Sequence, residues 1–77
     1  MIVRILLWNL GDSKTSLEEL RAHLPAIEPP SAWISNEAGE RFGLIAYGDE
    51  FPDVSEIRAL IGRDPDAGEE FDLEPRG

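Results

Sequence analysis

The sequence predicts an α+β domain in which four strands and two helices follow one another in the order βαββαβ. Two apolar runs, residues 2–10 and 41–48, have the length and the branched or aromatic composition of strands. After each run, apolar residues recur at helical spacing behind a capping residue, first at Ser16 and again at Asp53. The expected strands are residues 2–10, 32–35, 41–48 and 70–74.

The first and third strands are predicted to lie at the centre of the sheet, because both are apolar on both faces. With the two less apolar strands at the edges, the sheet is antiparallel and ordered 4-1-3-2. Right-handed crossovers then place both helices on one face. We call the face opposite the helices the open face. Val3, Ile5 and Leu7 are expected to point toward the helices, so that Leu6 and Trp8 lie on the open face.

The first helix is predicted from a capping box at Ser16-Leu17-Glu18-Glu19, followed by the stripe Leu17, Leu20 and Leu24 and closed by Pro25. The second helix takes Asp53 as its N-cap and ends at Gly62. Its inward residues are expected to be Val54, Ile57, Leu60 and Ile61.

The remaining segments read as loops and a fourth strand. Three prolines make residues 26–31 a loop, residues 36–39 form a hairpin turn, and residues 63–68 form a second loop. In the strand 70–74 the alternation predicts Phe71 and Leu73 inward and three carboxylates toward the open face. Residues 75–77 are expected to be a tail.

Length and composition indicate one domain, residues 1–77, without a disulfide framework, because the chain has no cysteine. The absence of cysteine fits a reducing cytoplasm, so a cytoplasmic protein is expected. The N-terminal apolar run is too short for a membrane span and lacks a signal-peptide cleavage site, so it is interpreted as a strand of a soluble protein. Sixteen acidic residues against seven Lys and Arg give a net charge of −9. Nucleic acid is therefore a disfavoured partner, since phosphate binding needs a basic surface.

Two segments resemble the RNA-recognition motif family, and the resemblance extends over nearly the whole chain. The octamer Glu40-Arg41-Phe42-Gly43-Leu44-Ile45-Ala46-Tyr47 is similar to the signature of the family's central strand, and Ile5-Leu6-Leu7-Trp8-Asn9-Leu10 is similar to that of its first strand. The resemblance implies a ferredoxin-like, RRM-like βαββαβ sandwich. It also implies that Leu6 and Leu44 occupy the positions where family members stack bases, and that Glu40 replaces a basic residue.

These replacements predict a domain of that fold that has lost RNA binding and acts as a non-enzymatic protein-interaction module. The open face would self-associate into a homodimer or bind a protein partner, unless the C-terminal tail or the 26–31 loop covers it. The expected interface residues are Leu6, Trp8, Trp33, Phe42 and Leu44. A shift of one residue would exchange Trp33 with Ile34.

Two alternatives are a weak single-stranded RNA or DNA binder that uses Trp8, Arg41 and Phe42, and a ferredoxin-like ligand-binding or enzymatic dimer. The sequence indicates no catalytic, cofactor-binding or metal-binding residue. His23 is the only histidine, with no base or ligand partner near it in sequence. The acidic loop at residues 64–70 fails the EF-hand spacing, because its glycine is fifth instead of sixth.

Overall fold

The computed structural model describes residues 1–74 and contains the expected four strands and two helices. The elements are β1 (Ile2–Asn9), α1 (Leu17–Ala22), β2 (Ala32–Asn36), β3 (Arg41–Tyr47), α2 (Ser55–Ile61) and β4 (Ala67–Asp72). The predicted α+β class and the four-stranded antiparallel sheet are confirmed. The predicted tail, residues 75–77, lies outside the described residues.

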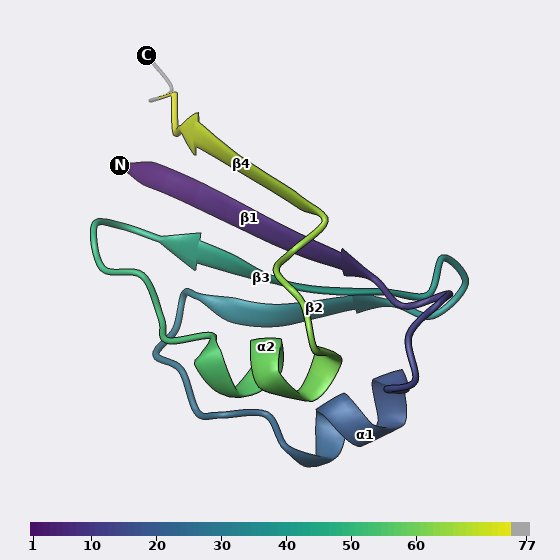
Figure 1. Ribbon diagram of the computed structural model, residues 1–77. Coiled ribbons are helices and arrows are strands. Elements are labelled where there is room, and N and C mark those ends of the chain that lie inside the picture. The colour runs from purple at the N-terminus through teal and green to yellow at the C-terminus, as the bar shows by residue number, and fades with distance from the viewer. Residues whose placement is uncertain (75–77) are drawn as a thin grey trace.

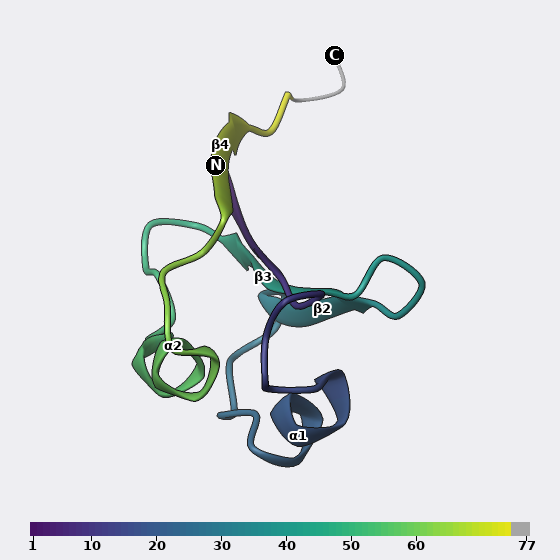
Figure 2. The same ribbon diagram turned by 45° about the vertical axis from the view of Figure 1, so that its right-hand side comes forward.

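The sheet has the strand order β2-β3-β1-β4, and every neighbouring pair is antiparallel. Read from the β4 edge, this is 4-1-3-2. Both helices lie on the same side of the sheet, as Figure 1 and the turned view in Figure 2 show. The arrangement is compatible with a ferredoxin-like fold. Two layers, one of strands and one of helices, therefore make up residues 1–74.

The helix ends follow the predicted capping residues closely. Ser16 caps α1, where its hydroxyl accepts a hydrogen bond from the Glu19 N–H at 3.1 Å. At α2 the N-cap is Val54, one residue later than predicted, while the Asp53 carboxylate accepts from the Ser55 N–H at 2.9 Å. Gly62 ends α2 with a left-handed φ of 89°, a conformation that glycine adopts without a steric cost.

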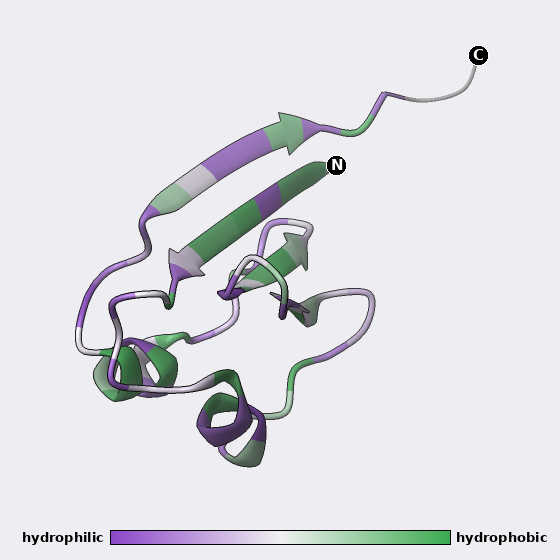
Figure 3. Ribbon diagram, turned by 90° about the vertical axis from the view of Figure 1, so that its right-hand side faces the viewer, coloured by the Kyte–Doolittle hydropathy of each residue, from purple (hydrophilic) through white to green (hydrophobic). Residues whose placement is uncertain are grey.

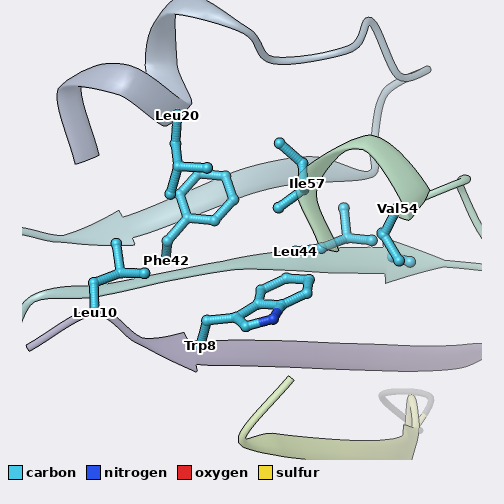
Figure 4. Close-up of a cluster of buried hydrophobic side chains, with 8 residues drawn as sticks. Trp8, Leu10, Leu20, Phe42, Leu44, Val54 and Ile57 are labelled. Carbon is cyan, nitrogen blue, oxygen red and sulfur yellow. The ribbon is translucent and has the colours of Figure 1, made fainter. Parts of the chain in front are cut away.

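The hydrophobic core lies between the helices and the sheet face that they cover, which we call the helix-side face (Figure 4). Trp8, Phe42 and Leu44 come from the two central strands, and Leu20 and Ile57 come from the two helices. None of these five side chains is more than 1% exposed. The helices are short, so their stability depends on this contact more than on intrinsic helix propensity.

The predicted assignment of the two sheet faces is wrong. Trp8, Phe42 and Leu44 point toward the helices, and the alternation of strand side chains then turns Val3, Ile5 and Leu7 to the opposite face. Burial of the largest rings gains more than burial of the aliphatic set. The loops beside the helices also supply carbonyl partners for both indoles: Trp8 Nε1 donates to Arg63 O at 3.0 Å, and Trp33 Nε1 donates to Pro25 O at 2.8 Å.

The same inversion changes β4. Phe71 was expected to point inward and is instead 49% exposed on the open face, while Leu73, also expected inward, is 49% exposed just beyond the strand. Glu70 was expected on the open face; it lies on the helix-side face, where it pairs with Arg4 at 2.8 Å. Leu60, predicted inward on α2, is 38% exposed.

Adjacent residues on β3 provide a direct test of the face assignment. Leu44→Ala is expected to lower the free energy of unfolding by about 2–5 kcal/mol, because it removes a side chain with 0% exposure from the core. Ile45→Ala, one residue further on and half-buried on the open face, should cost about 1 kcal/mol. Urea denaturation at low protein concentration measures both. Equal losses, or a larger loss at Ile45, would contradict the observed faces.

A second prediction concerns Asp66, which ties the loop before β4 to the end of β1. Its carboxylate accepts from the Asn9 N–H at 2.7 Å and from the Arg63 guanidinium at 3.0 Å. The Asn9 N–H chiefly, and Arg63 in addition, hold the pKa of Asp66 below its ordinary value. A depressed carboxyl pKa stabilises the fold above the unfolded-state pKa, and this contribution is lost as pH falls through the folded-state pKa.

Asp66→Asn is therefore expected to lower the Tm at pH 7, with the difference from wild type narrowing as pH falls below about 4. Thermal denaturation followed by circular dichroism over this pH range measures the difference. Asp64→Asn is the control, because Asp64 is largely exposed and, among residues 1–74, its one ion-pair partner is Arg58. A difference that stays constant down to about pH 2 would show that the charge of Asp66 does not matter.

Candidate interaction surface

The open face of the sheet carries apolar side chains from all four strands. Strand alternation and register place on it the side chains that lie opposite the core positions of each strand. Its large apolar residues are Val3, Ile5 and Leu7 from β1, Ile34 from β2, Ile45 and Tyr47 from β3, and Phe71 from β4. These seven residues, drawn from all four strands, define the open-face patch; Phe71 is exposed, Val3 is buried and the other five are half-buried.

No segment among residues 1–74 packs over the open-face patch. The core cluster and the side chains packed against it contain none of the seven residues. Both helices and the loops that lead into them are on the other side of the sheet (Figure 2). Val3 is only 6% exposed, because it lies between Tyr47 and Phe71 in the register. Figure 3 shows β1 as hydrophobic over most of its length. The polar residues in the sequence of this strand are Arg4 and Asn9.

Charge is sparse on this face although the chain as a whole is strongly acidic. Among the strand positions that point to the open face, only Arg41 on β3 and Glu69 on β4 are charged. Their charges cancel, while the whole chain carries −9. The acidic excess therefore lies on the helices, the loops and the helix-side face. The patch itself offers apolar contact with no net charge.

The residues predicted for the interface lie on the helix-side face instead. This holds for all five expected residues: Leu6, Trp8, Trp33, Phe42 and Leu44. Three are buried in the core, and Leu6 and Trp33 pack against it half-buried, with Trp33 stacked on Phe42 at 5.7 Å between ring centroids. Of the residues named for the nucleic-acid alternative, only Arg41 is on the open face.

Sequence reasoning did not assign Ile5, Leu7, Ile34 or Ile45 to the open face, although it identified the strands that carry them. One signal in the sequence could have corrected this. Both tryptophans and Phe42 lie on the same face of the sheet once the strands are aligned. Burial of these large rings stabilises a small core more than burial of smaller side chains.

A separate hollow of about 510 Å³ lies between the proline-rich loop and the segment that leads into α2. Four carboxylates line it, together with the partly exposed ring of Phe51. They are Glu28, Glu50, Asp53 and Glu56. The Ser55 backbone N–H, followed by its side chain, holds the pKa of Asp53 below the ordinary value, so this carboxylate is ionised and engaged at the start of α2.

The described part of the chain brings together no evident catalytic or metal-binding constellation. Among residues 1–74, no group of three or more His, Cys, Asp or Glu side chains is arranged to hold a metal ion. His23 is exposed at the C-cap of α1, where its backbone N–H donates to Leu20 O. Within those residues, no helix has the length and apolar composition to cross a membrane.

No protein-family model matches the chain, and neither does any curated protein. The function of the chain is therefore inferred from the geometry and chemistry of the open face.

Proposed function

We propose that the domain is a protein-interaction module that self-associates through the open-face patch. The observation that carries this proposal is the apolar surface of seven large side chains over four strands, with no described segment over it. Contiguous apolar surfaces of this kind are rare on monomeric soluble proteins and mark contact sites. Association removes the patch from water, and the hydrophobic effect favours that removal.

The size of the face supports a contact of modest strength. Four strands spaced about 4.8 Å apart and about 20 Å long give a flat footprint of roughly 400 Å². Two such faces bury roughly 800–1,200 Å² in total once side-chain relief is included, which is at the lower limit for a specific interface. We therefore expect a dissociation constant in the micromolar range or weaker.

The neutrality of the open face favours a second copy as the occupant. A basic partner would be drawn to the acidic helices and loops, not to a patch whose two charges cancel. A second copy offers the same neutral, apolar surface, and a surface that meets its own image forms an isologous dimer. A different protein with an apolar face is the competing outcome in the experiments below.

A ferredoxin-like, RRM-like assignment is supported by the order βαββαβ and by two helices on one face. The closer resemblance to the RNA-recognition motif stays a prediction. Base stacking on Trp8 and Phe42 finds no support, because the two rings are 0% and 1% exposed. The expectation of a non-enzymatic, cytoplasmic protein likewise stays a prediction.

The test places a charge at the centre of the open face. Ile45 lies on β3 between Ala32 and Ile5 in the register, so Ile45→Lys would bury an unpaired ammonium in the dimer. We expect wild type to show concentration-dependent dimerisation and Ile45→Lys to weaken it by about a hundredfold or more. Sedimentation velocity over a wide concentration range measures the effect.

Leu60→Lys is the matched control, because it makes the same change of charge at an exposed apolar position of α2. It should dimerise like wild type, and circular dichroism should show both variants folded. Wild type that stays monomeric at millimolar concentration would overturn the proposal. Equal weakening by the two variants would move the contact from the sheet to the helices.

Salt provides an independent prediction. Each copy carries a net charge of −9, so the two copies repel each other even though the contacting faces are neutral. Raising NaCl from about 20 mM to about 300 mM shortens the Debye length and should strengthen dimerisation severalfold. An affinity that falls with added salt would show that long-range attraction, not apolar burial, drives the contact.

A further inference from the structure

Arg41 and Glu69 are the two charged residues on the strand positions of the open face, and neither has an ion-pair partner among residues 1–74. Most other basic side chains in that range do have one. Four are paired with a carboxylate, at distances of 2.8–3.0 Å: Arg4, Arg21, Arg58 and Arg63. Arg41 and Lys14 are the exceptions among the described residues. Two unpaired charges of opposite sign at the border of an apolar patch can determine the orientation in which that patch binds its partner.

The register places these two charges symmetrically about Leu7. Arg41 lies on β3 opposite Asn9 of β1. It is therefore displaced from Leu7 by two residues toward the C-terminal end of β1 and by one strand toward β3. Glu69 lies on β4 opposite Ile5 of β1. It is therefore displaced from Leu7 by two residues toward the N-terminal end of β1 and by one strand toward β4. With a rise of about 3.3 Å per residue and about 4.8 Å between strands, each charge lies roughly 8 Å from Leu7 in opposite directions.

This placement is self-complementary under a two-fold rotation. Consider a two-fold axis that lies in the plane of the interface and passes over Leu7. If this axis is perpendicular to the line from Arg41 to Glu69, rotation about it exchanges those two positions. Arg41 of each copy then faces Glu69 of the other, so one rotation creates two equivalent ion pairs. Packed sheets are about 10 Å apart, a gap that an arginine and a glutamate can bridge from opposite sides.

We propose that the second copy docks in this one orientation, with Leu7 at the axis and reciprocal Arg41–Glu69 pairs at the two ends of the patch. The strands of the two sheets then cross at about 70°, near the orthogonal class of sheet packing. The same rotation places Ile34 of one copy over the pair formed by Ile5 and Ile45 of the other. This inference rests on the proposed function, because it specifies the geometry of that association.

Reversing the charges of Arg41 and Glu69 in separate variants tests the orientation, because the proposed geometry predicts that the two variants prefer each other to themselves. Arg41→Glu alone places two Glu–Glu contacts in its homodimer, and Glu69→Arg alone places two Arg–Arg contacts in its own. Each single variant is expected to weaken self-association by about tenfold. An equimolar mixture restores two opposite-charge pairs in the heterodimer, so the heterodimer should form with near wild-type affinity. Native mass spectrometry resolves it from both homodimers by mass.

Two controls account for the change of net charge. Lys14→Glu alters the net charge as Arg41→Glu does, at the other unpaired basic side chain, which lies in the loop before α1. Glu18→Arg alters it as Glu69→Arg does, at an exposed position of α1. Neither control should weaken dimerisation beyond what net charge accounts for, and a mixture of the two should show no heterodimer preference beyond that effect.

The outcomes separate this inference from the proposed function. If wild type dimerises and Ile45→Lys does not, but the reversed pair behaves like the two controls, the open face is the interface and the orientation is wrong. If wild type is monomeric at every concentration, the proposed function itself fails. A heterodimer preferred about tenfold or more over both homodimers supports the reciprocal pairs.

Discussion

The packing of Trp8 and Phe42 against Leu20 and Ile57 is the contact on which the rest of the structure depends. Two short helices and a sheet meet there, and the rings of neighbouring strands lie 6.4 Å apart between centroids. Once these two rings face the helices, the pleat of β1 and β3 determines the face on which every other side chain of the two strands lies. Every second residue of each central strand must lie on the opposite face, whatever its hydrophobicity.

That constraint explains why the open face is apolar. β1 alternates a helix-side set, Leu6 and Trp8, with an open-face set, Val3, Ile5 and Leu7, and both sets are hydrophobic. In a two-layer domain one of them has no second layer to pack against. A solvated face would be expected to carry polar residues on alternate positions. That pattern is absent from the two central strands, and the two helices, of six and seven residues, lie on the other side of the sheet, so the absence supports the proposed contact at the open face.

Much of the fold could be predicted from the sequence, and the assignment of the faces could not. The strands, the cap at Ser16 and the stop at Gly62 depend on local chemistry that the residues display directly. The choice between two apolar faces depends on which set of side chains fits beneath the helices, and this is a property of packing in three dimensions. Resemblance to an RNA-binding signature favoured the wrong choice, because it assigned Phe42 and Leu44 to the open face. The bounds predicted for β1, β2 and β3 were right to within one residue, whereas β4 begins at Ala67 and ends at Asp72 instead of spanning residues 70–74. The assignment of side chains to the two faces was wrong.

The inversion also changes what the acidic composition does. When the carboxylates of β4 were expected on the open face, the only conclusion drawn from the acidic composition was that RNA is a disfavoured partner. In the structure Glu70 pairs with Arg4 on the helix-side face, and Glu69 is the only acid on the open-face strand positions. The acidic excess therefore surrounds a neutral apolar patch instead of covering it. Such a distribution opposes association between two copies at long range, yet leaves the proposed short-range contact free of like-charge repulsion. A surface of this kind is suited to a weak contact that forms only when the partner's apolar face and its two charges match in one orientation.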